Sequence, residues 1–244
     1  MVMIKRTKRI SIPVLAVLIS GIGVSFTTGK FRQQNTPPVV KIINPKNNDT
    51  FSPGNQVSYK ISVTDKEDGD TRYDEINVKE VLLEVKYVAN RAMLQTIIKN
   101  DRQNDPPGFM LLRTSNCFNC HNFNSKAMGP SFHDIAVKYP VTTANVELLV
   151  KHIREGSVNV WGKDPMPAHP DLSPEDAKVA VGWILKNGKD TSVNYYAGTT
   201  GVFRTKPNQK GTYVLIASYV DHGLKTAVSK SLKGTDAVIL NGNK

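Results

Sequence analysis

The sequence predicts a chain of several domains, in which an all-helical segment lies between β-rich segments. The chain has 244 residues, more than the usual single domain of about 100–150 residues. Residues 57–63 alternate apolar and polar side chains, which is the period of a half-buried strand. Residues 142–188 carry the apolar spacing and the capping residues of helices. After residue 198, glycine and proline separate short apolar runs, which favours strands.

The first 29 residues have the layout of an export signal. A basic cluster at residues 5–9 precedes an uncharged apolar run at residues 10–26. The run has about 17 residues, near the lower limit for crossing a bilayer. We therefore expect a signal peptide or an uncleaved N-terminal membrane anchor over residues 1–29, with the rest of the chain exported.

Residues 37–88 predict a small antiparallel β-sandwich of immunoglobulin-like type. Apolar runs at 39–43, 56–64 and 80–88 are separated by turn residues and by an acidic loop at 65–70. The loop lacks the ligand spacing of an EF-hand, so a hairpin loop is favoured over a calcium site. Three motifs resemble those of the PKD-type domains of exported bacterial proteins: Pro37-Pro38-Val39, Asn44-Pro45-Lys46 and Ser52-Pro53-Gly54.

Residues 107–190 predict a compact helical domain, preceded by a linker over residues 89–106. The proline pair at 106–107 ends any helix that begins in the linker. A threonine cap at 142 or 143 begins one helix, and a serine, a proline and two acids at 173–176 begin the last. Because the segment has its own caps and apolar faces, we expect it to fold on its own.

Both cysteines of the chain lie in one pentapeptide, Cys117-Phe118-Asn119-Cys120-His121. Thiols at i and i+3 lie about one turn apart, so both can reach the vinyl groups of a single haem as thioethers. The histidine that follows offers its imidazole to the iron. The motif therefore predicts one covalently attached haem c, and the alternatives are a dithiol redox pair or a structural disulfide.

Residues 107–188 resemble a small single-haem class I bacterial cytochrome c. The matching segments, in order, are Cys117-Phe118-Asn119-Cys120-His121, Met128-Gly129-Pro130-Ser131-Phe132, Val160-Trp161-Gly162, Pro165-Met166-Pro167 and the C-terminal helix. The resemblance implies the fold class: a multidomain chain with an all-α class I cytochrome c domain between an N-terminal immunoglobulin-like β-sandwich and a small C-terminal β segment.

The same resemblance implies how the haem is held. His121 would be the proximal iron ligand and Met166 the distal one, on the opposite haem face. The carbonyl of Pro130 would accept a hydrogen bond from the second ring nitrogen of His121. Trp161 would pack at the haem edge near a propionate; its alternative is a plain core position, because indole rings also pack in cores without haem.

The position of Met166 in the sequence also favours it as the distal ligand. Met166 lies 45 residues beyond His121, which leaves room for a helix and a loop, whereas Met128 follows after only seven. The flanking prolines stiffen the backbone that presents the thioether. His169 is the rival ligand because imidazole also binds haem iron. An open sixth position is the third possibility.

Residues 191–244 predict a small β-rich C-terminal domain, which we expect to pack on another domain because about 50 residues make a small sandwich. The order of PKD-like segment, cytochrome and β tail resembles the C-terminal part of large exported sugar dehydrogenases of the glucose/sorbosone type. These residues include no dehydrogenase portion, so the resemblance implies a redox partner and not an enzyme.

The leading hypothesis is an exported electron carrier with one His/Met-ligated haem, either periplasmic or membrane-anchored facing the periplasm. It would exchange electrons with an exported dehydrogenase or a terminal oxidase. The alternatives are a haem enzyme or gas sensor with a labile sixth ligand, and a purely structural adhesive module.

The charge distribution argues against a nucleic-acid partner. The formal net charge is +11, of which residues 1–36 carry +6 and residues 191–244 carry +5, whereas residues 107–190 carry only +1. Nucleic-acid binding requires a concentrated basic face.

Overall fold

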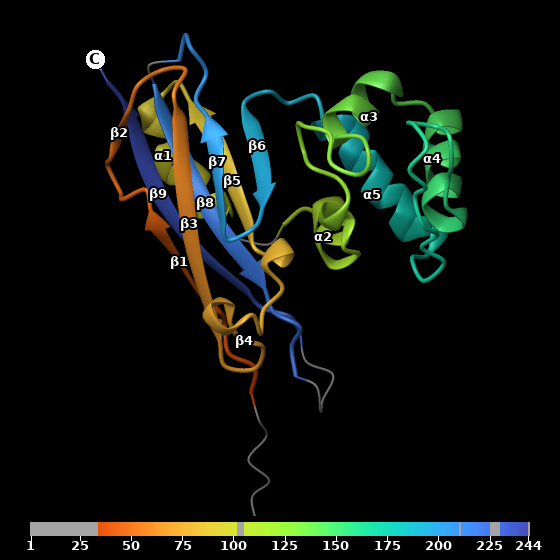
Figure 1. Cartoon of the computed structure of the whole chain (residues 1–244), viewed down its shortest axis with the longest axis horizontal. Helices are drawn as coiled ribbons and strands as arrows, with labels where there is room; N and C mark the ends of the chain where they lie inside the picture. Colours follow the sequence, from red (N-terminus) through yellow and green to blue (C-terminus); the bar gives the residue numbers. More distant parts are fainter. Residues whose placement is uncertain (1–33, 102–104, 210, 225–229, 244) are drawn as a thin grey trace, which may run out of the picture. The chain divides into compact units, whose positions relative to one another are not determined.

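The computed structural model describes residues 34–101, 105–209, 211–224 and 230–243 (Figure 1). The expected signal peptide or membrane anchor, residues 1–29, lies outside the described part of the chain. Among the described residues, no helix has the length and apolarity that a membrane span requires.

Strands from both ends of the described chain form two sheets. In the first sheet, β3 (Gln56–Asp65) pairs antiparallel with β1 (Val39–Asn44), β4 (Gly69–Asp70) and β7 (Thr200–Arg204). The second sheet has the order β2 (Thr50–Phe51), β9 (Lys233–Gly242), β8 (Thr212–Val220), β5 (Leu82–Val88) and β6 (Val193–Ala197). Its pairs are antiparallel except β2 with β9, which is parallel.

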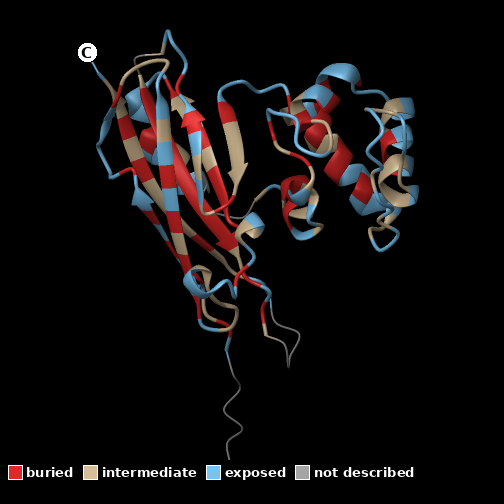
Figure 2. Cartoon of the chain, viewed as in Figure 1, coloured by how far each residue is buried: buried red, intermediate tan, exposed pale blue. Residues whose placement is uncertain are grey.

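The two sheets share one apolar core. The alternation predicted for residues 57–63 is confirmed, because Tyr59, Ile61 and Val63 are buried and the residues between them are exposed or half-buried. These side chains meet apolar residues of the second sheet, including Leu83 and Leu215, in a single cluster. Figure 2 shows buried positions alternating with more exposed ones along β3.

The expected fold class, an all-α domain between two separate β segments, is wrong. The chain is a mixed α and β protein, because strands from before and after the helical residues interleave: β7 pairs with β3, and β8 pairs with β5. Without β7 and β8, strands β3 and β5 would lose hydrogen-bonding partners along one edge. Because unpaired buried backbone groups are costly, the strands from the two ends of the chain pair with each other. The helical residues also contain a β-type contact, an antiparallel bridge between Ser157 and Met166.

The predicted linker over residues 89–106 contains a short helix. After the 3-10 turn η3 (Arg91–Met93), α1 (Leu94–Asp101) places Leu94 against Val88, Val214 and Ile216. Val214 and Ile216 alternate along β8 with residues of the shared core, so α1 covers the opposite face of the second sheet.

Four further helices follow, and three of them begin at a capping side chain. They are α2 (Pro107–Thr114), α3 (Phe132–Lys138), α4 (Thr143–Glu155) and α5 (Pro174–Asn187). The hydroxyls of Ser131, Thr142 and Ser173 accept from backbone N–H groups in the first turns of α3, α4 and α5. The two caps expected at 142 and 173 are therefore confirmed.

Helices α2 and α5 touch at a glycine. A Cβ added to Gly108 would lie 2.6 Å from the carbonyl oxygen of Val179 and 2.5 Å from Cβ of Trp183. Only glycine allows this backbone approach. The contact brings the start of α2 next to the middle of α5, so the first and last helices of the segment lie side by side. The segment can therefore be inserted between β5 and β6, which pair with each other.

The helical segment shares its core with the second sheet. Leu82 of β5 and Val193 of β6 belong to the same buried cluster as Phe109 and Leu112 of α2. The ring of Tyr195 on β6 lies 4.6 Å from the ring of Phe109, centroid to centroid. The β strands thus complete the helical core, which gives a physical reason against the expectation that this segment folds on its own.

Replacing Leu82 with alanine should destabilise the protein by about 2–5 kcal/mol, because Leu82 is only 2% exposed and its truncation leaves a cavity between strand and helices. Denaturant unfolding followed by far-UV circular dichroism measures the change. Val202→Ala is the matched control: Val202 of β7 is 50% exposed, so its loss should cost within about 0.5 kcal/mol. Equal effects would refute the shared core.

Candidate functional site

The predicted attachment motif forms one tight turn after α2. Asn116 adopts a left-handed backbone with φ of 59°, which reverses the chain into η4 (Cys117–Asn119). The amides of Cys120 and His121 then donate to the carbonyl of Cys117 at 3.2 and 3.0 Å. Both thiols and the imidazole are thereby carried on a single turn.

The two cysteines are free thiols and half-buried, with no disulfide between them. Burial raises the pKa of the Cys117 thiol to about 11, so this group is protonated at neutral pH. Two adjacent free thiols are what a pair of thioether bonds requires.

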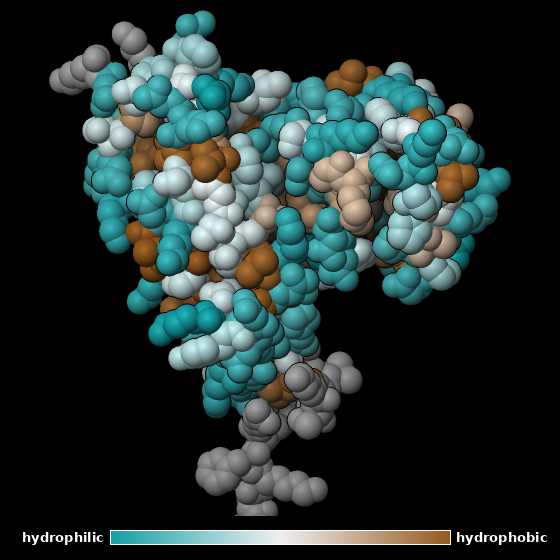
Figure 3. Space-filling view, viewed as in Figure 1, coloured by the Kyte–Doolittle hydropathy of each residue, from teal (hydrophilic) through white to brown (hydrophobic). Residues whose placement is uncertain are grey.

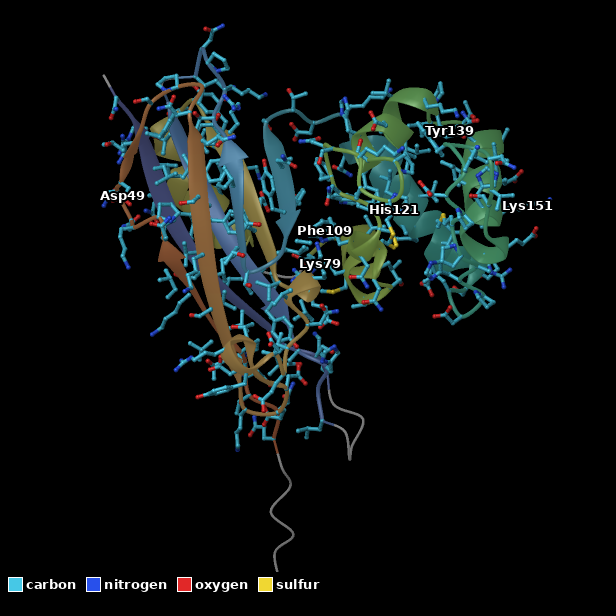
Figure 4. The ribbon with its side chains drawn as sticks, viewed as in Figure 1. Asp49, Lys79, Phe109, His121, Tyr139 and Lys151 are labelled. Atoms are coloured by element: carbon cyan, nitrogen blue, oxygen red, sulfur yellow. The ribbon has the colours of Figure 1, made fainter. Side chains whose placement is uncertain are left out.

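His121 is held in one orientation and one tautomer. Its Nδ1 lies 2.7 Å from the carbonyl oxygen of Pro130, so Nδ1 carries the proton and Nε2 carries the lone pair. The ring stacks on Phe132 at 5.5 Å, within the helical segment (Figure 4). Burial lowers the pKa of His121, against the hydrogen bond to Pro130, and the charge of His169 lowers it further. The neutral imidazole is the form that can bind a metal.

Gly129 makes room for the imidazole. A Cβ at this position would lie 2.5 Å from Cε1 and 2.8 Å from Nδ1 of His121. Its amide donates to the carbonyl of Cys120 at 2.9 Å, which fixes the loop against the motif. The sequence analysis did not identify Gly129 as a site residue, although the Gly-Pro pair after the motif was a visible signal.

The backbone of Met166 is held by the end of α4. Met166 and Ser157 exchange backbone hydrogen bonds of 2.8 and 3.1 Å, and the amide of His169 donates to Ile153 at 2.9 Å. Gly156 has φ of 80°, and a Cβ there would lie 2.8 Å from the carbonyl oxygen of Met166. Within residues 162–170 only Met166 and His169 are half-buried, whereas the others are exposed.

Trp161 lies at the margin of the helical core. It is half-buried and packs against the helical cluster, with its ring 6.3 Å from that of Tyr139. The ammonium of Lys138 lies 4.2 Å from the centre of the indole ring, in the range of a cation–π contact. The indole is therefore positioned by groups on both sides.

These residues fit a covalently held haem. The donor set is two free thiols, a neutral imidazole with its lone pair on Nε2, and a thioether in a braced loop. The absence of a side chain at Gly129 leaves room for the imidazole in this orientation. Among the described residues, no cluster of three or more His, Cys, Asp or Glu side chains is arranged to hold a metal ion directly. Together the turn and the helices define a c-type cytochrome domain.

Known proteins agree with this class. The chain is 40% identical over 75 residues to cytochrome c-552 of Nitrosomonas europaea, covering 31% of this chain and 73% of that protein. It is 38% identical over 78 residues to cytochrome c-551 of Pseudomonas denitrificans, covering 32% of this chain and 94% of that protein. The chain therefore belongs to the class I cytochromes c of the c-551/c-552 type, through about a third of its length.

Among solved structures, the crystal structure of wild-type Nitrosomonas europaea cytochrome c552 is 39% identical, with 31% of this chain and 94% of that chain covered and a TM-score of 0.30. No family model matches the chain.

Replacing Gly129 with alanine in the haem-loaded protein should displace the His121 ring, because a Cβ would sit 2.5 Å from Cε1. We expect a stability loss of about 1–3 kcal/mol and a partly high-spin ferric absorption spectrum. Gly182→Ala is the control, since a Cβ there meets nothing within 4 Å. A low-spin spectrum identical to wild type in the Gly129 variant would show that the close approach does not constrain the imidazole.

Proposed function

We propose that this chain is an exported electron carrier with one haem c, bound through Cys117 and Cys120 and ligated by His121 and Met166. The observation that carries the proposal is the 2.7 Å contact between His121 Nδ1 and Pro130, which leaves Nε2 as the metal-binding atom within an intact attachment motif. Membership of the cytochromes c supports it.

The bound haem would supply a one-electron ferrous–ferric couple. Cys117 and Cys120 would hold it covalently, and His121 and Met166 would be its iron ligands. A thioether ligand favours the ferrous state and so raises the reduction potential. Because the chain itself would supply two iron ligands, this arrangement favours electron transfer over a haem enzyme or gas sensor, which needs a labile ligand.

The other work of the protein is to keep water away and the ligands still. Phe123 and Phe132 are 0% and 2% exposed, and Phe118 is 4% exposed, beside the attachment turn. The ring of His121 is fixed by its hydrogen bond to the carbonyl of Pro130, and the loop of Met166 is fixed by backbone hydrogen bonds with Ser157. Such a rigid, dry shell reduces the rearrangement that accompanies a change in iron charge.

The partner is proposed to be an exported dehydrogenase or a terminal oxidase, met in the periplasm. Support comes from the basic and apolar segment at residues 1–29, which has the layout of a signal peptide or membrane anchor. Exposed apolar side chains also lie near the ligand loops in sequence: Met128, Val137, Val141 and Val158 are 57–68% exposed. Figure 3 shows separate apolar patches on a largely hydrophilic face of the molecule.

Mass spectrometry of the protein matured with haem-attachment machinery should show one added haem that resists acid–acetone extraction. Replacing either Cys117 or Cys120 with alanine removes one thioether and should yield partly extractable or poorly matured haem. The double substitution should leave no covalent haem. Extractable haem in the wild-type chain would contradict the proposal.

Met166→Ala should abolish the weak far-red sulfur-to-iron absorption band of the ferric protein while leaving the haem attached. Met128→Ala is the matched control, because Met128 is 64% exposed and lies in another loop. The far-red band of the Met128→Ala variant should equal that of the wild-type protein. Loss of the band in the Met128 variant alone would identify Met128 as the ligand, and a low-spin Met166 variant would point to His169.

A further inference from the structure

Arg113 is a buried cation next to the haem-attachment turn. It lies in the last turn of α2, four residues before Cys117. Its side chain is only 4% exposed, although arginine is almost never fully buried unless paired.

The partners of Arg113 come from outside the helical segment's core. Its Nη1 donates to Asp105 at 2.7 Å and to the hydroxyl of Ser218 at 3.1 Å, and Nη2 donates to the carbonyl of Ser218 at 3.3 Å. Ser218 belongs to β8, 105 residues further along the chain. The forked hydrogen bonds of the Arg113 guanidinium group, called the fork below, therefore fasten α2 to the second sheet with more than one hydrogen bond.

Asp105 is shared with a second cation. Lys233 of β9 pairs with its other carboxylate oxygen, and the side chains of Asp105 and Lys233 are 8% and 12% exposed. Glu84 of β5 lines the same crevice as Asp105, Ser218 and Lys233, so carboxylates and cations lie together at this boundary. Because removing ions from water is expensive, such a cluster is weak evidence for stability by itself. Its geometry points to a positional role.

A short run of backbone, residues 113–121, links the fork to the predicted haem-attachment residues, and hydrogen bonds hold this run in a compact turn. The carbonyl of Arg113 accepts from the amide of Asn116 at 3.4 Å, and the carbonyl of Asn116 accepts from Asn119 at 3.0 Å. In the same turn, the amides of Cys120 and His121 donate to the carbonyl of Cys117. Lys79, Glu80 and Leu82 of the β-rich part line a small crevice together with Arg113 and Phe118, so the turn is also backed from that side.

We propose that Arg113 is a positioning residue of the haem site, which fastens the turn of Cys117 to His121 onto strand β8 so that the β-sandwich helps to set the reduction potential. This inference rests on the proposed function. A guanidinium cation held by this fork four residues from Cys117 favours the ferrous state, because ferrous haem carries one positive charge less. Loosening the fork should therefore lower the midpoint potential.

The test compares variants of the full chain, matured with haem, by spectroelectrochemical titration. Arg113→Met removes the fork and should lower the midpoint potential. Arg91→Met is the matched control: it removes the same charge from an exposed side chain that donates to Asn241 at 2.9 Å, and its potential should equal that of wild type. Equal potentials in all three proteins would overturn the proposal.

Arg113→Lys separates position from charge, because lysine keeps the cation but cannot form the fork. We expect its potential to stay below that of wild type. Full recovery would mean that charge alone acts, and the positioning role would be wrong.

If the Arg113→Met variant does not incorporate haem, the Ser218→Ala variant tests the proposal instead. It removes one hydrogen-bond acceptor of Arg113 on β8 and leaves the cytochrome residues intact. It should lower the potential by less than the arginine substitution would, and an unchanged potential overturns the inference. Failure of the proposed function is recognised separately, as a wild-type chain without covalent haem.

Discussion

The pairing of β5 with β6 is the constraint on which the rest of the structure depends. These neighbouring strands pair from Leu82 with Ala197 to Lys86 with Val193, yet the whole helical segment lies between them in the sequence. The segment must therefore begin and end close together. Gly108 satisfies this requirement, because it lets α2 approach α5 to backbone contact. Insertion into a pair of strands then gives the segment two attachments to one sheet.

That insertion explains why the helical core extends beyond the helices. Leu82 and Val193 stand at the two ends of the strands that bracket the segment, and both are buried in its apolar cluster. Arg113 adds a polar fastening to β8 at the same boundary. A free-standing cytochrome would expose this side to water. Here Leu82 and Val193 of the flanking strands pack against this side.

The site itself is built mainly from short-range backbone geometry. The hydrogen bond from His121 to Pro130 spans nine residues, and the bridge from Ser157 to Met166 spans the same number. Local features of this kind leave a pattern in the sequence: the attachment motif, the Gly-Pro pair and the prolines around Met166. For that reason the sequence alone is enough to propose candidate site residues. It did not assign Gly129 or Gly156 to the site, because their close approaches to His121 and to the carbonyl of Met166 are defined only in the folded chain.

The sequence by itself determined the attachment turn, the helix caps at 142 and 173 and the alternating strand at 57–63, because each depends on residues within a turn or a strand of one another. Tertiary structure decided which strands pair: β3 with β7 and β5 with β8 join residues more than a hundred positions apart. Strand pairing is governed by backbone groups that every residue carries, so the sequence of either segment does not specify its partner. The burial of Arg113 was equally hidden, because its partner Ser218 lies 105 residues away in the sequence.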